Sequence, residues 1–314
     1  MKAVIAESLG ISEELLSELE EPFVKEGVEF VSYERTDDTE VLTQELQDAD
    51  ILIVANMPVK GEVIEALDHL KFIDVAFTGV DHIGLSAAEK KHITVSNASG
   101  YSNEAVSELV LGMVLSSLRN LRQVEDRCRN GGTKAGLIGQ EIKGKTVGIV
   151  GLGAIGSRSA ELFQAFGAEV IAAVRHPEKH VDSAIPIVSL DEVLKRSDIV
   201  VLHCPLNEET RGLINAEKLS LMKPSALLVN VARGPVVNTA DLADALNRGI
   251  IAGACIDVFD QEPPLHGDPL LEVNHVLVTP HVAFATEESM KLRAEIVFDN
   301  LRAWLDGTPK NTVL

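Results

Sequence analysis

The chain has 314 residues, of which 46% are hydrophobic and 24% are charged, and this globular composition excludes the disordered and fibrous classes. Its 48 acidic against 28 basic residues give a formal net charge of −20. A surface so negative repels phosphate backbones and anionic lipids, so we expect neither a nucleic-acid nor a membrane partner. The length favours about two domains.

Cysteine usage and the lack of long apolar runs indicate a cytoplasmic protein. Cys128, Cys204 and Cys255 lie far apart without C-x-x-C spacing, which predicts reduced core thiols, no disulfide and no metal site. No apolar run in the sequence reaches the roughly 18 residues that span a bilayer. The chain opens directly on the strand-like Lys2–Ala6, without the pattern of a secretory signal.

Short apolar runs alternate with amphipathic stretches over the first hundred residues. This alternation predicts βαβ units around a parallel sheet that is covered on both faces. Strands are predicted at 3–6, 28–31, 51–55, 72–77 and 93–95, and helices at 12–20, 39–48, 60–68 and 84–91.

The alternation stops at residues 99–103, and a long helix is predicted to follow. Apolar residues recur there every three or four positions from Val106 to Leu121, and Asn130-Gly-Gly132 ends the pattern. A second α/β series begins at Lys145, so we predict two doubly wound parallel-sheet units joined by one long helix. Periodicity does not decide which unit the last helix packs on. The strands of this series are predicted at 146–150, 169–174, 198–202, 226–230, 250–256 and 276–279, and the last helix at 286–306.

A glycine-rich turn follows the first strand of the second unit. The strand Thr146–Val150 runs into Gly151-Leu-Gly-Ala-Ile-Gly156 and then into a helical stretch. Gly151 permits the tight turn, Gly153 lets the backbone approach a pyrophosphate, and Gly156 lets the helix pack closely on the strand. The helix N-terminus supplies N–H donors for the phosphates. A turn that serves only packing is the alternative, but the strand before it and the helix after it favour dinucleotide binding.

The strand after this turn lacks the acidic residue that usually binds the adenosine ribose about 20 residues on. It ends at Val174, and Arg175 and His176 follow, with Lys179 and His180 close behind. A guanidinium fork suits a 2′-phosphate better than a 2′-hydroxyl, so NADP(H) is favoured as cofactor and NAD(H) stays an alternative. An ordinary exposed basic loop is the competing interpretation.

One cation, one carboxylate and one imidazole each follow a predicted strand of the second unit. They are Arg233, Glu262 and His281. In a doubly wound sheet, residues just past the carboxyl ends of strands face the crevice that receives the cofactor. Arg233 can hold a substrate carboxylate bidentately. His281 can exchange a proton with the substrate oxygen, and Glu262 would favour and orient the protonated imidazole. Singly, each residue has an ordinary structural explanation, but the three together downstream of a nucleotide turn favour catalysis.

These segments, in order and spacing, closely resemble the D-isomer-specific 2-hydroxyacid dehydrogenase family over nearly the whole chain. The resemblance implies a nicotinamide-dependent reduction of a small 2-oxo acid to the D-2-hydroxy acid, as in glyoxylate/hydroxypyruvate reductases and phosphoglycerate dehydrogenases. It implies that Arg233 anchors the substrate and that Glu262 and His281 form the acid–base pair. The motifs that carry it are Gly151–Gly156, His203-Cys-Pro-Leu206, Asn230-Val-Ala-Arg-Gly234, Asp257…Glu262-Pro263 and Thr279-Pro-His281.

The resemblance also implies further contacts. The backbone N–H groups of Gly79 and Val80 would bind the substrate carboxylate, and Asp257 would contact the nicotinamide carboxamide. Cys204-Pro205 would lie against the adenosine. The cofactor contacts expected in total are Gly151, Gly153, Ala154, Ile155, Gly156, Arg175, His176, Cys204, Pro205, Thr210, Val231, Ala232 and Asp257.

The domain plan of the family implies a Rossmann cofactor domain, residues 99–283, inserted into a flavodoxin-like substrate domain, residues 1–98 plus 284–314, with closure by a hinge. Family members are usually dimers, so we expect a homodimer whose interface includes the long helix and the segment after it. Asn56 and Met57 follow the third strand and are the residues expected to contact the substrate side chain. Met57 suggests an adaptable apolar pocket or, alternatively, a core residue.

Some positions depart from the family pattern. Val174-Arg175 replaces the acid of NAD-dependent members, and residues 131–136 lack the tryptophan of some hydroxypyruvate-reducing relatives. The chain ends at Leu314 without the regulatory extension of many phosphoglycerate dehydrogenases, which weakens a serine-biosynthetic role.

Relatives on the same scaffold have two other functions. Some relatives act as dinucleotide-sensing binding proteins or co-repressors, and measurable turnover would discriminate against that function. Formate-oxidising relatives typically carry Gln where this chain has Glu262, because they need no proton donor to an oxyanion. Glu262 therefore favours oxo-acid chemistry.

Overall fold

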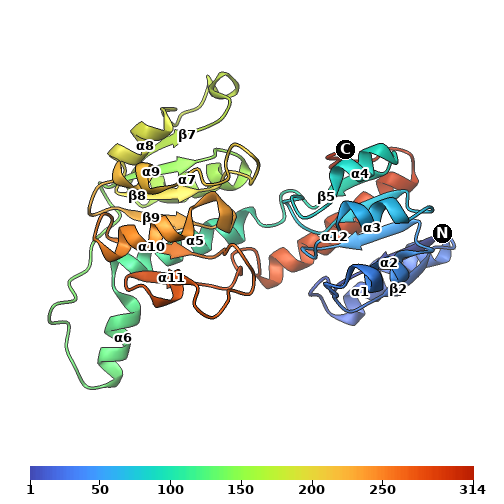
Figure 1. Cartoon of the computed structure of the whole chain (residues 1–314), viewed down its shortest axis with the longest axis horizontal. Coiled ribbons are helices and arrows are strands. Elements are labelled where there is room, and N and C mark those ends of the chain that lie inside the picture. The colour runs from blue at the N-terminus through green and yellow to red at the C-terminus, as the bar shows by residue number, and fades with distance from the viewer. The chain divides into compact units, whose positions relative to one another are not determined.

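The computed structural model describes residues 1–314, which fold into two α/β units. Unit 1 comprises Met1–Ser102 and Ala285–Leu314, and unit 2 comprises Asn103–Phe284 (Figure 1). These boundaries lie a few residues from the ranges predicted for the two domains. The last helix, whose place periodicity left open and the family plan gave to the substrate domain, belongs to unit 1.

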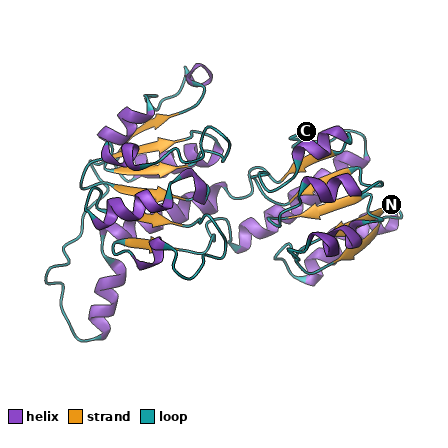
Figure 2. Ribbon diagram, in the orientation of Figure 1, coloured by secondary structure: helices purple, strands orange, loops and turns teal.

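Unit 1 is built on a five-stranded parallel sheet with the order β2-β1-β3-β4-β5. All residues of β3 and β4 are buried, because helices cover both faces of the sheet (Figure 2). The elements are β1 Lys2–Ile5, α1 Glu13–Lys25, β2 Glu29–Ser32, α2 Thr39–Leu46, β3 Ile51–Val54, α3 Gly61–Ala66, β4 Phe72–Val75, α4 Leu85–Lys90, β5 Thr94–Asn97 and α12 Glu287–Leu305.

Helix α12 packs on β4 and β5 through one aromatic stack and one amide. The rings of Phe72 and Trp304 are stacked with centroids 5.0 Å apart. The Asn300 side-chain nitrogen donates to Asp74 Oδ1 and to the carbonyl of Asn97, each at 3.0 Å. Asp74 is fully buried, and burial raises its pKa well above the usual range despite the hydrogen bond from Asn300.

Unit 2 contains a six-stranded parallel sheet with the order β11-β10-β9-β8-β6-β7. Its elements are α5 Asn103–Leu118, α6 Leu121–Arg129, β6 Thr146–Val150, α7 Ala154–Ala165, β7 Glu169–Ala173, the 3-10 helix η1 Pro177–His180, α8 Leu190–Arg196, β8 Ile199–Leu202, α9 Ala216–Ser220, β9 Leu227–Asn230, the 3-10 helix η2 Gly234–Val236, α10 Thr239–Asn247, β10 Gly253–Ile256, α11 Pro269–Glu272 and β11 Val276–Val278. The predicted fold class, two parallel-sheet α/β units, is confirmed.

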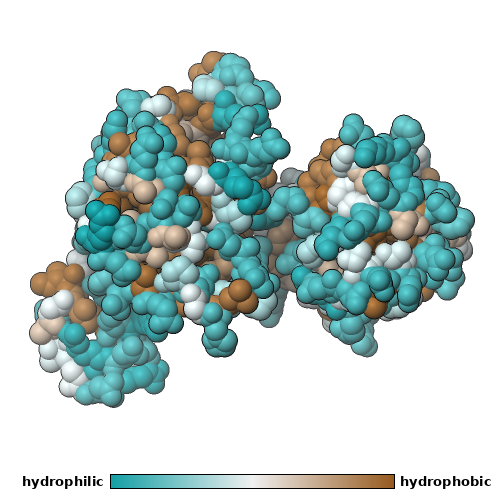
Figure 3. All heavy atoms as spheres, in the orientation of Figure 1, coloured by the Kyte–Doolittle hydropathy of each residue, from teal (hydrophilic) through white to brown (hydrophobic).

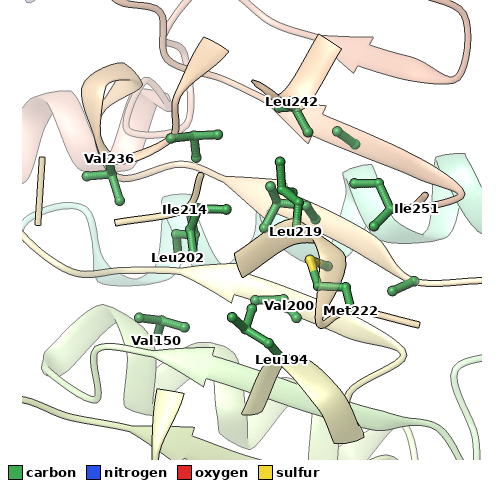
Figure 4. Close-up of a cluster of buried hydrophobic side chains, with 14 of the residues drawn as sticks. Val150, Leu194, Val200, Leu202, Ile214, Leu219, Met222, Val236, Leu242 and Ile251 are labelled. Atoms are coloured by element: carbon green, nitrogen blue, oxygen red, sulfur yellow. The ribbon is translucent and has the colours of Figure 1, made fainter. Parts of the chain in front are cut away.

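The sheet of unit 2 divides a hydrophobic core into two clusters, one on each face. Side chains of β8 alternate between them, since Val200 and Leu202 join one cluster while Ile199 and Val201 join the other. The first cluster also contains Leu219 and residues of α8 and α10, as Figure 4 shows. Packing on both faces of the sheet fixes the positions of the strand ends, and the loops of the site begin there.

The single long helix predicted after residue 103 is wrong, because the chain forms two helices there. Helix α5 ends at Leu118, and Asn120 adopts a left-handed conformation with φ of 51° before α6 begins. A left-handed residue interrupts the i to i−4 hydrogen bonds, and asparagine adopts this conformation at low cost. No residue of α6 is buried.

The cysteine prediction needs one correction. Cys204 and Cys255 are buried free thiols, as predicted, and burial raises their pKa values to about 11 and about 12. Cys128 is exposed and lies on α6, a helix without any buried residue. Figure 3 shows that hydrophilic side chains cover most of the visible surface, in keeping with the acidic composition. No helix combines the length and the apolar character needed to cross a membrane.

Candidate active site

The glycine-rich turn lies where the strand order of unit 2 reverses, between the ends of β7 and β8. The backbone N–H of Gly151 donates to the carbonyl of Ala173 at 2.9 Å, and the backbone N–H of His203 donates to the carbonyl of Val150 at 2.8 Å. Gly151 has a φ of +98°, and a Cβ there would meet the backbone of residues 203 and 204. Open α/β sheets bind ligands at such a switch point.

The start of α7 offers donors to an anion. Its N-cap residue, Gly153, makes no side-chain capping bond, so the first backbone N–H groups of the helix are available to a phosphate. A Cβ at Gly156 would collide with the carbonyl of Gly151, whereas one at Gly153 would meet nothing within 4 Å. The glycines thus have different roles: Gly156 permits close packing, and Gly153 leaves the side open from which a pyrophosphate would approach. Ala154 and Ile155 form the first turn of the helix.

A polar relay through two buried serines, which the sequence did not predict, ties this turn to α5. His203 Nε2 lies 2.9 Å from Ser159 Oγ, which donates to Ser107 Oγ at 3.1 Å, and Ser107 donates to the carbonyl of Ile155 at 3.3 Å. Burial lowers the pKa of His203 to about 4, so its imidazole is neutral at physiological pH. The His-Cys-Pro motif was the available signal, but its serine partners lie too far away in the sequence to be inferred.

Of the residues expected near the adenosine, Arg175, His176 and Pro205 are exposed, whereas Cys204 is buried. Arg175 Nη2 donates to Glu209 Oε1 at 2.6 Å, and both side chains are 60% exposed. His176 Nδ1 lies 3.1 Å from Glu178 Oε1. Thr210 donates its hydroxyl to the carbonyl of Pro205 at 2.6 Å, which closes the loop after β8. The sequence did not identify Glu209 as the partner of Arg175.

The structure brings His281 and Glu262 into direct contact. His281 Nδ1 lies 2.6 Å from Glu262 Oε2, with side chains 16% and 33% exposed. Glu262 Oε1 accepts from the backbone N–H of Phe259 at 3.1 Å, so both carboxylate oxygens are engaged. Burial raises the pKa of Glu262, but the hydrogen bond and charge of His281, with smaller contributions from Phe259 and Arg233, outweigh it and lower this pKa.

Asp257 holds the loop that carries His281. Its carboxylate is fully buried and accepts from Thr279 Oγ1 at 2.6 Å and from the backbone N–H groups of Val282 and Ala283 at 2.9 and 3.0 Å. Its carbonyl accepts from the N–H of His281 at 2.7 Å. His281 has a φ of 54°, a costly conformation for a residue other than glycine, which persists because surrounding bonds enforce it. Asp257 is therefore a positioning residue in this structure.

Arg233 lies half-exposed in the turn after β9, which also contains Val231 and Ala232. Asn230 organises this turn by accepting from the N–H of Ala232 at 3.1 Å and donating to the carbonyl of Arg233 at 2.9 Å. A Cβ at Gly234 would collide with the backbone of Phe259, so the turn lies tightly against the loop that carries Glu262. Arg233, Glu262 and His281 thus come from the ends of three adjacent strands, β9, β10 and β11.

The remaining predicted substrate residues belong to unit 1. Gly79 and Val80 follow β4 and are partly exposed, and their backbone N–H groups donate no hydrogen bond within the chain. Asn56 follows β3 and is also partly exposed. Met57 is fully buried, and its N–H donates to Glu7 Oε1 at 2.6 Å. This corrects the assignment of Met57 to the substrate pocket and supports its alternative interpretation as a core residue.

The chain is similar to named dehydrogenases and reductases. Residues 111–283 match the family model described as D-isomer specific 2-hydroxyacid dehydrogenase, NAD binding domain. The chain is 38% identical to a glyoxylate reductase of Thermofilum pendens, covering 90% of this chain and 87% of that one, and 36% identical to a glycerate dehydrogenase of Methylorubrum extorquens, covering 91% and 92%.

A solved structure is similar over nearly the whole chain. It is an NADPH-dependent glyoxylate/hydroxypyruvate reductase from Sinorhizobium meliloti in complex with NADP and malonate. Its TM-score is 0.87 at 29% identity, with 99% of this chain and 96% of that chain covered.

Proposed function

The chain belongs to the D-isomer specific 2-hydroxyacid dehydrogenase family, and from that premise we propose that Arg233, Glu262 and His281 carry its reaction. It is a nicotinamide-dependent oxidoreductase that transfers a hydride between the cofactor and C2 of a 2-oxo acid. The observation that carries the assignment of residues is the 2.6 Å pair of His281 and Glu262, held at the end of β11 beside the turn of Arg233.

In the direction of reduction, His281 donates a proton to the C2 oxygen. The bound nicotinamide supplies the hydride, that is, the electron pair that forms the new C–H bond. Because Nδ1 of His281 is engaged by Glu262, we assign Nε2 as the donating nitrogen. Glu262 stabilises the charged imidazole before the transfer, and Arg233 holds the substrate carboxylate with two parallel hydrogen bonds. The reverse reaction uses the same groups with His281 as base.

In unit 1, the N–H groups of Gly79 and Val80 would bind a substrate carboxylate. Two adjacent backbone donors without partners in the chain form a small anion-binding concavity. In a chain with a net charge of −20, an anionic substrate is held only by such placed donors and cations. Residues 1–98 with 284–314 would then serve as substrate domain and residues 99–283 as cofactor domain.

NADP(H) is the cofactor that we favour. Support comes from Arg175 at the end of β7, where the usual carboxylate is missing, and from the bound NADP of the similar Sinorhizobium enzyme. Glu209 opposes this preference in part, since its carboxylate occupies the Arg175 guanidinium at 2.6 Å. A 2′-phosphate would have to displace that carboxylate, and NAD(H) would leave the pair intact.

A homodimer is the assembly that we propose. Helix α6 and the segment after it project from the sheet of unit 2 (Figure 1), with Leu121 and Ile138 49% and 88% exposed. A cavity of about 460 Å³ lies between the end of α5, the start of α6 and the amino ends of β10 and β11. Exposed apolar side chains beside a depression favour association with a second copy. Sedimentation of the purified chain tests this, and a mass of one 33.8 kDa chain would contradict it.

One experiment tests the proposed reaction. NADPH and NADH oxidation are followed in parallel with glyoxylate, hydroxypyruvate, pyruvate and longer branched or aromatic 2-oxo acids. We expect turnover of at least one short 2-oxo acid, faster with NADPH. Tight dinucleotide binding without turnover of any of them would instead favour the dinucleotide-sensing or co-repressor function.

A further inference from the structure

Three polar side chains from three different elements of unit 2 form the relay behind the glycine-rich turn. His203 follows β8, Ser159 lies on α7 and Ser107 lies on α5. His203 Nε2 lies 2.9 Å from Ser159 Oγ, and Ser159 donates to Ser107 Oγ at 3.1 Å. Ser107 in turn donates to the carbonyl of Ile155 in the first turn of α7 at 3.3 Å. We refer to Ser107, Ser159 and His203 as the relay.

The last acceptor of the relay fixes the direction of all its hydrogen bonds. A carbonyl only accepts, so the Ser107 hydroxyl uses its single proton on Ile155. Ser159 uses its proton on Ser107, and its oxygen must then accept from His203. The imidazole of His203 is neutral, since burial lowers its pKa to about 4, and a neutral ring has one N–H. We therefore assign that N–H to Nε2, and the protons of the relay have one arrangement.

The relay lies in an otherwise apolar part of the core. Ser107 and Ser159 are 1% and 0% exposed. Replacing all partners of such a buried network by apolar groups of similar shape costs little stability. What a fully hydrogen-bonded network adds is one specific arrangement of the groups that it joins. The apolar residues that α5 and α7 contribute to the same core cluster are Val106, Val110, Met113, Val114, Ala160 and Phe163.

The relay holds α7 at two levels one helical turn apart. Ser107 contacts α7 at Ile155 and at Ser159, which are four residues apart and therefore lie on the same face of the helix. A hydroxyl of α5 bonded to both points opposes sliding and rotation of α7. His203 adds a third point, and its backbone packs against the turn, since a Cβ at Gly151 would lie 2.8 Å from its carbonyl carbon.

The part of α7 that is held in this way is the part that offers donors to a phosphate. The backbone N–H groups of Ala154, Ile155 and Gly156 donate no hydrogen bond within the chain, and the first helical bond runs from Ser157 to Gly153. Hydrogen bonds weaken steeply when the donor and the acceptor are misaligned. The strength of the bonds to a phosphate therefore depends on how the start of α7 is oriented.

We propose that Ser107, Ser159 and His203 are positioning residues for the cofactor, which set the orientation of the N–H donors at the start of α7 towards its pyrophosphate. This inference rests on the proposed function, since it takes the glycine-rich turn as the cofactor site. The relay acts on the affinity for the dinucleotide and not on the stability of the fold. A chain without the relay folds and binds NADPH and NADH more weakly.

The main test replaces the whole relay by apolar side chains. Ser107→Ala, Ser159→Ala and His203→Leu are combined in one variant, so that no side chain of the network keeps an unpaired donor. Fluorescence titration should give Kd values for NADPH and NADH that are roughly 10- to 100-fold higher, the equivalent of one hydrogen bond to a charged group. The midpoint of thermal unfolding without cofactor should stay the same or rise, and kcat at saturating cofactor should change little.

Two single variants test the assigned N–H of His203. His203→Gln places an amide N–H near the position of Nε2 and should keep most of the cofactor affinity. His203→Leu leaves Ser159 without its donor and should weaken cofactor binding. Ser197→Ala is the matched control, because Ser197 is a fully buried serine of the same unit whose hydroxyl has no partner. It should leave both Kd values unchanged.

The outcomes separate this inference from the function on which it rests. Weaker binding at unchanged or raised stability in the triple variant supports the positioning role. Unchanged Kd values in that variant would overturn this inference alone. A triple variant that is less stable as well as weaker in binding would assign the relay a structural role and also overturn the inference. Equal Kd values for His203→Gln and His203→Leu would contradict it whatever the stability of the triple variant. A wild type that binds neither NADPH nor NADH would overturn the proposed function and the inference with it.

Discussion

Each unit contains one fully buried aspartate, Asp74 within β4 and Asp257 directly after β10, and the two differ in how many donors surround them. Asp257 in unit 2 accepts three hydrogen bonds through its carboxylate, shared between both oxygens. Asp74 in unit 1 accepts one, from Asn300, and its Oδ2 has no partner. Burial alone raises the pKa of a carboxyl, as it does for Asp74. The number of hydrogen-bond donors around a buried carboxylate, more than its degree of burial, therefore decides whether it organises a site.

The largest expected effect is on the residue that Asp257 holds in place. His281→Ala should lower the rate of 2-oxo acid reduction about 10²- to 10⁴-fold, because the general acid is lost. Dinucleotide binding should change little, since the glycine-rich turn is untouched. Stopped-flow reduction rates and cofactor fluorescence titration measure the two. Near-normal turnover would contradict the acid role of His281.

Asp257→Asn tests whether the donors around this carboxylate matter. The amide nitrogen would face one of the backbone N–H groups or the Thr279 hydroxyl, leaving a donor opposite a donor at a cost of about 1–3 kcal/mol. Displacing His281 by a fraction of an ångström should lower kcat about tenfold or more. Thermal unfolding and kcat are measured together. A variant with normal kcat and normal stability would show that the three bonds are dispensable.

The exposed ion pair of Arg175 and Glu209 contrasts with the two buried aspartates, because solvent screens its charges. Arg175→Asp should shift the preference from NADPH towards NADH by roughly 10- to 100-fold, the equivalent of a charge-assisted hydrogen bond to the 2′-phosphate. Glu209→Gln should shift it towards NADPH by no more than about fivefold, since exposed ion pairs contribute at most about 1 kcal/mol. The measurement is the ratio of kcat/KM values for the two cofactors. An unchanged ratio in Arg175→Asp would remove this residue from phosphate recognition.

Asp74→Asn should give the smallest effect. It should raise the stability of the protein, whereas Asp257→Asn should lower it. A carboxyl whose pKa is raised in the folded state binds its proton more tightly there than in the unfolded state. The contribution of this group to the free energy of unfolding is then fully present below the unfolded pKa of about 4. It is lost as pH rises through the folded pKa. Because Asn does not ionise, the variant loses no stability as pH rises, and at neutral pH it should be about 1 kcal/mol more stable than the wild type. Denaturant unfolding at pH 5 and pH 8 measures it, and a destabilised variant at pH 8 would contradict the unpaired state of Asp74 Oδ2.

The sequence predicted most strands of both sheets to within one or two residues, because an apolar run between turn signals is a local pattern. Its one wrong element was the long helix, where the periodicity of α5 continued into Leu121 although Asn120 breaks the helix. A left-handed residue leaves no mark in hydrophobic spacing. Met57 is a second example, since the sequence pattern of an apolar residue after a strand is the same whether its side chain faces a ligand or the core.

What the sequence determined by itself is the class of the protein: two α/β units, a dinucleotide turn, and an arginine, a glutamate and a histidine each placed after a strand. Motif order along the chain was sufficient for that. Only the tertiary structure decided the partners. Asp257 meets Thr279 across 22 positions, Arg175 meets Glu209 across 34, and Glu7 meets Met57 across 50. Hydrogen bonds between strand ends depend on the order of strands in the sheet, and neighbours along the chain do not specify that order.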